Sequence, residues 1–385
     1  MRFSVLVPTR GGGAYLHGCL ASVLSAASDD VEVVVSDNAN DDETCAVLAG
    51  YAGDNRVRVV RQQTVLPVAD NWNAAYRASR GEYVLMLGDD DALLPDCFNV
   101  LRGLLDAHDE PDCLTYNAFS FVSPDAIAGL DVAHYADPHF RFDDSLRGEC
   151  ELSGSERRRI VSDMFRFRAR IPLNMQTTLV ARRAYEQLPD GPYRAPFPDH
   201  FALNALLLTV GRWVISPAKP LVVGVSSKSF GHHVYSDDQD EGLRYLGIET
   251  GFDTQLPGNE LLNATYIWLL MLKQTFPAEL EGVEVNRGDY VSRQLYAWYR
   301  QFRLGRLSRP ELGRRIRALG ARDIAAVVRA VGDPENGRRL GQAIVARGRA
   351  QQLWPGLLPL PGVQDIGQFV AWTARERAPT PGPTA

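Results

Sequence analysis

The sequence predicts an α/β fold in its first half, a largely parallel sheet covered by helices on both faces, followed by a mostly helical second half. Three observations support this. Runs of β-branched residues alternate with segments whose apolar residues recur at helical spacing. The strands expected at 3–7 and 82–88 are mainly apolar, as strands buried on both faces are. Polar side chains gather where these strands end, which is where open sheets of this kind bind ligands.

The elements follow one another in a regular order. In the first part we expect strands at 3–7, 31–37, 57–61 and 82–88, and helices at 16–26, 43–51 and 69–79. The pattern weakens over 119–170, which we interpret as an insertion or mixed loop region over the ligand site. A helix at 198–208 and strands at 213–216 and 220–225 follow. The second half predicts successive helices at 259–274, 289–302, 309–319 and 323–331.

These elements divide the chain into an α/β domain (1–240), a helical domain (241–377) and a proline-rich tail (378–385) that we expect to be disordered. The helical domain could pack against the first domain, form a homodimer or supply an acceptor surface. The arginine-rich face over 309–322 could contact anionic lipid or another subunit. Solvated arginines on a soluble helix are the commoner explanation.

The composition excludes several classes of protein. The chain has 385 residues and a net charge of -6, so we expect no nucleic-acid partner. Its five cysteines are widely spaced and include no CxxC pair, which favours a reducing compartment. The N-terminus does not have the pattern of a signal peptide. The longest apolar stretch lies over 266–272, far below the ~20 residues that span a bilayer. We therefore expect a cytoplasmic protein without a transmembrane segment.

An acidic run, Asp89-Asp90-Asp91, stands at the end of an expected buried strand. Binding a nucleotide sugar requires its diphosphate charge to be screened, and a divalent cation such as Mn²⁺ or Mg²⁺ does this through carboxylate ligands. One carboxylate could face the metal and another the ribose. The alternative is a solvated turn with one aspartate capping the helix near Leu93. Three like charges after a buried strand destabilise the fold without a cation, which favours the metal site.

Five segments together resemble family 2 glycosyltransferases of the GT-A fold, in order and in spacing, over about residues 1–235. They are Val5-Leu-Val-Pro-Thr-Arg10, Val33-Val-Val-Ser-Asp-Asn38, Asp70-Asn-Trp-Asn73, Arg80-Gly-Glu-Tyr-Val-Leu-Met-Leu-Gly-Asp-Asp-Asp91 and Leu93-Leu-Pro95. The resemblance implies a GT-A catalytic domain over 1–240. It does not extend to the helical domain.

The resemblance also implies roles for particular residues. Eight would bind the nucleotide sugar: Pro8, Thr9, Arg10, Asp37, Asn38, Asn71, Asp89 and Asp90. Among them, Pro8, Thr9 and Arg10 would lie against the base and the ribose. Asp37 would hold the base. Asp91 would bind the metal. The family often has an acid where this chain has Gly88, so the acidic motif is shifted here. Which of Asp89 and Asp90 meets the ribose therefore stays open.

Asp199 is the candidate catalytic base. In the family, an acidic pair that opens a late helix takes the proton from the acceptor hydroxyl, and here only the second acid is present, after Pro198. Such a base typically accelerates the reaction ~10²–10⁴-fold. A helix-capping aspartate is the competing explanation. The neighbouring His200 could serve instead, or face solvent.

The segment that follows the strand at 220–225 contains further candidates. Related enzymes often have a histidine there that completes the metal shell, and imidazole is a suitable ligand for manganese. His232 and His233 are the candidates, with an ordinary polar loop as the alternative. Lys228 could reach a phosphate, although solvated charge is the commoner explanation.

Together these features predict an inverting glycosyltransferase that moves a sugar from a nucleoside-diphosphate sugar to the hydroxyl of an unidentified acceptor. Two alternatives stay open. A mutase on the same fold would interconvert the pyranose and furanose forms of the bound sugar. A non-catalytic protein would bind the nucleotide sugar without turnover, although the acidic run argues against it.

Overall fold

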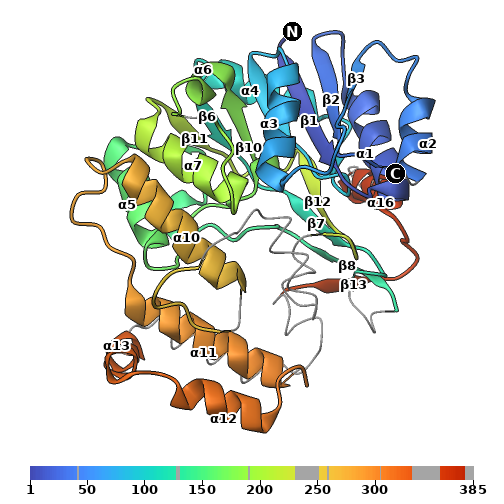
Figure 1. The fold of residues 1–385 in the computed structure, drawn as a ribbon. Helices are drawn as coiled ribbons and strands as arrows, with labels where there is room; N and C mark the ends of the chain where they lie inside the picture. The colour runs from blue at the N-terminus through green and yellow to red at the C-terminus, as the bar shows by residue number, and fades with distance from the viewer. Residues whose placement is uncertain are drawn as a thin grey trace, which may run out of the picture.

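The computed structural model describes residues 1–40, 43–126, 131–189, 191–229, 251–257, 260–303, 305–331 and 356–377. It contains an α/β part built on two sheets and a group of helices at one end (Figure 1). The tail at 378–385 lies outside the described residues.

The larger sheet has eight strands: β1 Phe3–Thr9, β2 Val31–Asp37, β3 Val57–Arg61, β4 Tyr83–Met86, β6 Cys113–Thr115, β9 Cys150–Glu151, β10 Thr178–Ala181 and β11 Trp213–Ile215. Their order is β3-β2-β1-β4-β10-β6-β11-β9. The first four strands are parallel, as the sequence predicts. Strand β10 is antiparallel to both β4 and β6, so the other half of the sheet is mixed.

Helices cover both faces of this sheet: α1 Gly13–Ala26, α2 Glu43–Gly50, α3 Val68–Ala78, α4 Cys97–Ala107, α5 Gly154–Met164, α6 Arg182–Tyr185 and α7 Pro198–Thr209. Alternate residues of β1 belong to different cores. Val5 and Val7 pack with α1 and α4, whereas Leu6 packs in the core that contains residues of α3 and α7. Burial on both faces explains why β1 is largely apolar along its length.

A second sheet consists of β5 Ala92–Leu93, β7 Phe119–Val122, β8 Ala133–Ala136, β12 Leu221–Val225 and β13 Leu358–Leu360, in the order β13-β8-β7-β12-β5. The interpretation of 119–170 as a mixed loop region is therefore wrong, because β7, β8, β9 and α5 all lie in it. The strands have two to four residues, too few for a periodic pattern, and β7 pairs with β12, a hundred residues away in the sequence.

The helical second half is confirmed by α10 Glu260–Thr275, α11 Arg287–Arg303, α12 Arg309–Arg317 and α13 Ala321–Val331. Trp268 and Trp298 of these helices are fully buried in the same core as Phe201 of α7. The first two helices thus extend the core of the α/β part. Among the described residues, no helix is long and apolar enough to span a membrane.

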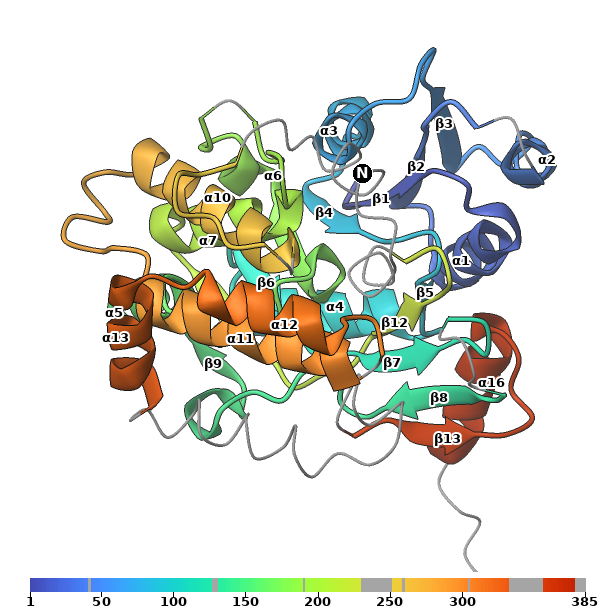
Figure 2. The ribbon, with the colours of Figure 1, turned by 60° about the horizontal axis from the view of Figure 1, so that its bottom comes forward.

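Residues 356–377 leave the other helices and return to the α/β part (Figure 2). Strand β13 pairs with β8 in antiparallel fashion, and helix α16 (Ile366–Arg377) packs beside α1 and β5. The ring of Phe369 is fully buried and lies 5.2 Å from that of Phe121, between ring centroids. The sequence places this segment in the helical domain, whereas the structure packs it against the second sheet.

One partly buried histidine, His139, gives the fold a pH dependence. Burial lowers the pKa of His139 to about 4, and its ring lies 2.7 Å from the hydroxyl of Ser120 on β7. Because the unfolded chain protonates near pH 6.5, stability should fall as the pH drops from 6.5 to 4, by up to about 3 kcal/mol. Urea unfolding at several pH values measures this. His139→Gln should flatten the profile, His17→Gln on the surface of α1 should not, and an unchanged profile in the first variant would refute the assignment.

Candidate nucleotide-sugar site

The ends of β1, β2 and β4 lie side by side at one edge of the larger sheet. Thr9 pairs in register with Asp37, and Leu87 and Gly88 connect β4 to the acidic run. The hydroxyl of Thr9 donates a hydrogen bond of 2.6 Å to Oδ2 of Asp89. The polar residues that the sequence places at these strand ends are thus neighbours in space.

The three aspartates have different surroundings. Oδ2 of Asp90 accepts hydrogen bonds from the hydroxyls of Ser226, at 2.8 Å, and Ser229. Asp91 is fully buried, and its two carboxylate oxygens accept hydrogen bonds from the backbone N–H groups of Gly88 (2.6 Å) and Gly224 (2.8 Å). Asp91 therefore ties the end of β4 to β12.

This geometry bears on the choice of metal ligand, for which the sequence predicts Asp91. Both oxygens of Asp91 are held by backbone groups, so its carboxylate is fixed inside the protein. Asp90, by contrast, accepts hydrogen bonds from two side-chain hydroxyls, and both end on the same carboxylate oxygen, Oδ2. Hydroxyls rotate and carboxylates accept several partners, which leaves Asp90 able to take a cation. On this geometry we propose Asp90, in place of Asp91, as the metal ligand.

Burial and mutual repulsion act on the whole acidic run. Burial raises the pKa of Asp89 to about 7, and the charge of Asp90 adds to this, while Thr9 and Lys228 act in the opposite direction. Burial, followed by the charge of Asp90, also raises the pKa of Asp91 well above its usual range. A cation beside these carboxylates would favour their charged forms.

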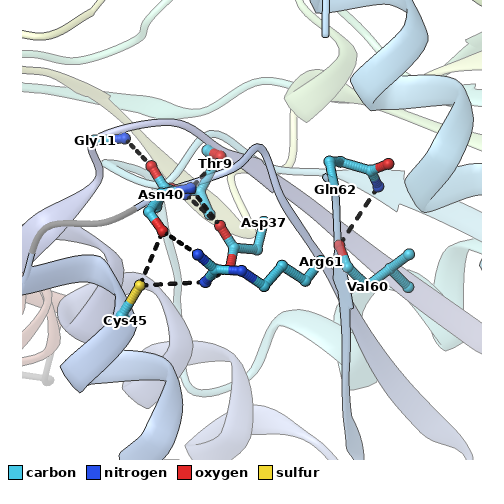
Figure 3. A network of polar contacts seen from close by, with 8 residues as sticks. All are labelled: Thr9, Gly11, Asp37, Asn40, Cys45, Val60, Arg61 and Gln62. Atoms are coloured by element: carbon cyan, nitrogen blue, oxygen red, sulfur yellow. Dashed lines mark hydrogen bonds and ion pairs between the residues drawn. The ribbon is translucent and has the colours of Figure 1, made fainter. Parts of the chain in front are cut away.

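Asp37, the candidate base-binding residue, lies in the polar network drawn in Figure 3. Asp37 accepts hydrogen bonds on Oδ1 from the backbone and side chain of Asn40, and its Oδ2 lies 2.8 Å from the guanidinium of Arg61. The Asp37 side chain is 2% exposed and that of Arg61 is 53% exposed. Asn38 bonds to the backbone of Leu66 through both ends of its amide. Asp37 and Asn38 thus shape the loops around the strand ends.

The remaining predicted residues lie in α3 and around the end of β1. Asn71 of α3 is fully buried, and its Oδ1 accepts a 2.7 Å hydrogen bond from Ser36. Its Nδ2 is buried and has no hydrogen-bond partner within the described ranges. Pro8 is partly buried near the end of β1, and Arg10 is exposed just beyond it.

A glycine turn between β1 and α1 is part of the site, although the sequence reasoning did not single it out. Gly11 and Gly13 have φ values of 66° and 49°. A Cβ atom on Gly12 would lie 2.5 Å from Oγ1 of Thr9 and 2.6 Å from Oδ2 of Asp89. Three successive glycines after a strand are a signal for a tight turn of this kind.

The segment after β12 closes one side of the site. The amine of Lys228 donates to the carbonyl oxygen of Gly11, and Ser227 donates a 2.8 Å hydrogen bond to Asp125, which also accepts from Tyr15. The segment is thus bonded to the glycine turn and to the acidic run, and Asp125 links it to Tyr15 of α1. His232 and His233, the candidate additional metal ligands, lie outside the described residues.

Asp199 and His200 open α7. Oδ1 of Asp199 accepts a 2.9 Å hydrogen bond from the backbone N–H of His200, and burial raises the pKa of the carboxyl group. The His200 ring packs near those of Phe197 and Trp268, at centroid distances of 5.1 and 5.8 Å. Burial lowers its pKa. Within the described ranges, neither residue hydrogen-bonds to the acidic run.

Comparison with known proteins agrees with the resemblance seen in the sequence. Residues 4–128 match the model of the family described as glycosyl transferase family 2. Glycosyltransferase GlyG of Streptococcus pneumoniae is 27% identical over 99 residues, 26% of this chain and 33% of GlyG. Chondroitin synthase of Escherichia coli is 33% identical over 94 residues, 24% of this chain and 14% of the synthase. The chain therefore spans a third or less of the length of these curated relatives.

A solved structure extends the likeness beyond the matched residues. The crystal structure of Staphylococcus aureus TarS 1–349 in complex with UDP-GlcNAc superposes with a TM-score of 0.52 at 15% identity, covering 98% of this chain and 92% of that one. At this identity the likeness shows the fold alone, and it confirms the predicted GT-A architecture with a C-terminal helical part. The resemblance to family 2 glycosyltransferases is confirmed for residues 4–128.

Proposed function

We propose that this protein is a metal-dependent glycosyltransferase that transfers a sugar from a nucleoside-diphosphate sugar to an acceptor hydroxyl with inversion. The observation that carries the proposal is the acidic run at the end of β4, held against Thr9 on one side and against the segment after β12 on the other. Strand ends of an open sheet are where such ligands bind. The match of residues 4–128 to glycosyl transferase family 2 supports the reaction class.

The residues fit a divalent cation of the Mn²⁺ or Mg²⁺ type. No group of three or more His, Cys, Asp or Glu side chains within the described ranges is arranged to hold a metal by itself. Mg²⁺ sites commonly use one or two carboxylates and complete their shell with substrate phosphates. Asp90, with Asp89 beside it, is such a partial set. A cation bound there would balance the charge that develops on the departing diphosphate.

The chain's own residues have distinct tasks in this proposal. Asp91 fixes the turn after β4, and Thr9 orients Asp89 toward the ribose. Asp37, Asn38 and the residues near Pro8 surround the base. Asp199 accepts the proton of the acceptor hydroxyl, and its burial, which raises its pKa, makes it the stronger base.

Donor turnover without an acceptor tests the proposal. The protein is incubated with Mn²⁺ or Mg²⁺ and a panel of UDP-, GDP- and dTDP-sugars, beginning with UDP-GlcNAc because TarS was crystallised with it. Slow release of a nucleoside diphosphate that stops on chelation supports the proposal. NMR identifies the sugar anomer that forms first, and an anomeric configuration opposite to that of the donor shows inversion. A new sugar nucleotide of unchanged mass would instead show a mutase, and tight donor binding without release would show a non-catalytic protein.

We expect Lys228 to contact the donor diphosphate. Its amine lies at the glycine turn, and its charge lowers the pKa of Asp89. Hydrogen bonds to charged groups contribute about 1.5–3 kcal/mol, so Lys228→Met should raise the donor KM roughly 10- to 100-fold. Lys273→Met is the matched control, because Lys273 of α10 forms an ion pair with Glu284 outside that helix. A donor KM equal to wild type in Lys228→Met would exclude the contact.

A further inference from the structure

Helices α12 and α13 expose an unusual concentration of aliphatic side chains. Ile316, Ile324 and Val328 are 46%, 55% and 69% exposed, and they are three of the seven exposed large hydrophobic residues within the described ranges. Their neighbours Leu312 and Val327 pack against the core. The two helices therefore bury one apolar set and present a second one outward. Ile324 and Val328, four residues apart, lie on one side of α13.

Arginines accompany these aliphatic residues. Residues 287–331 contain eleven arginines, no lysine and three acidic residues, although the whole chain has a net charge of -6. Each of the three acids lies in an ion pair. Asp289 pairs with Arg166, and Asp323 pairs with Arg287. Glu311 pairs with both Arg314 and Arg315. Within the described ranges, Arg309, Arg317 and Arg322 are exposed and form no ion pair. The excess positive charge is therefore available to a partner.

We propose that the outer surface of α12 and α13, defined by Ile316, Ile324, Val328, Arg309, Arg317 and Arg322, binds an anionic lipid surface. Arginine side chains bind headgroup phosphates, while aliphatic side chains enter the boundary with the acyl chains. Figures 1 and 2 show both helices beside α11, away from the parallel strands β1 to β3. The proposal does not depend on the reaction proposed above.

Charge and residue type favour lipid over other partners. A symmetric pairing with a second copy would bring two arginine-rich surfaces together, and like charges across an interface oppose association. Single-stranded nucleic acid is bound largely by stacking bases on aromatic rings. The exposed apolar residues here are aliphatic. An anionic bilayer matches both the charge and the aliphatic side chains.

Vesicle sedimentation of the full chain tests the proposal. We expect binding to phosphatidylglycerol vesicles, weakened by salt, and little binding to phosphatidylcholine vesicles. Each arginine near an anionic surface contributes roughly a fivefold factor. Arg309→Ser/Arg317→Ser/Arg322→Ser should therefore weaken binding about a hundredfold. Ile324→Ser/Val328→Ser should weaken it roughly tenfold or more.

Matched controls separate this surface from general effects. Arg77→Ser/Arg141→Ser/Arg158→Ser removes three exposed arginines elsewhere, and Val59→Ser removes an exposed valine of β3. Both controls should bind like wild type, and circular dichroism verifies the fold of every variant. Three outcomes would overturn the proposal: no binding by wild type, equal binding by all variants, or a concentration-dependent dimer that Ile324→Ser/Val328→Ser dissociates.

Discussion

Asp90→Asn should reduce donor turnover about 10³-fold, or ~4 kcal/mol of transition-state stabilisation, without lowering the melting temperature. The substitution removes one charge from a run of three neighbouring carboxylates, so repulsion within the folded protein decreases. The amide oxygen of asparagine can still accept the bonds from Ser226 and Ser229. Initial rates with saturating Mn²⁺, together with thermal unfolding, measure both effects.

Two further variants make this result specific. Asp96→Asn changes an exposed aspartate a few residues along the chain and should retain full turnover. Asp91→Asn should lose stability and turnover together, because an amide nitrogen cannot accept the hydrogen bond from Gly88 or Gly224. Full turnover in Asp90→Asn combined with a stable, inactive Asp91→Asn would restore Asp91 as the metal ligand.

Gly224→Ala should destabilise the protein by roughly 3 kcal/mol and abolish turnover. A Cβ atom at this position would overlap the backbone carbonyl oxygen of Asp90 and lie 2.6 Å from its carbonyl carbon. Backbone cannot rotate out of the way as a side chain can, so β12 must move. That movement breaks the 2.8 Å bond to Asp91. Urea unfolding and donor turnover measure the two losses.

Gly103→Ala is the matched control for this variant. Gly103 lies in α4, and nothing comes within 4 Å of a Cβ atom placed there. Alanine in a helix interior is favoured over glycine by about 0.5–1 kcal/mol. This variant should therefore gain stability and keep its turnover. A Gly224→Ala protein as stable as wild type would show that β12 does not depend on close contact with the acidic run.

The first half of the fold is readable from the sequence because its signals are local. The strands at 31–37 and 57–61 have the bounds that their β-branched runs predict, and the helix at 198–208 begins at its proline. The second sheet was not predictable in this way. Its strands have two to five residues, and apart from β7 with β8 they pair with segments about a hundred or more residues away. Such pairings depend on tertiary packing and leave no periodic signal.

The location of the site was predictable from the sequence, but the role of each aspartate in it was not. Parallel strands bring their ends together, which placed Thr9 near Asp89. Which aspartate is held by backbone depends on Gly224, far along the chain, and no local pattern reveals that contact. The glycine turn at 11–13 did carry a local signal. The bonds of Ser226 and Ser229 to Asp90 required the three-dimensional arrangement.

The return of residues 356–377 to the α/β part has a consequence for biosynthesis. Strand β13 and Phe369 complete a sheet and a core in which β7 and β8 are made more than 200 residues earlier. Translation at 5–20 residues per second separates these events by roughly 10–40 seconds. During that interval the aromatic face of β7 and the edge of β8 lack their final cover on the ribosome. This stage of synthesis is therefore the one most exposed to misassociation, and chaperone dependence should end once residue 377 has emerged.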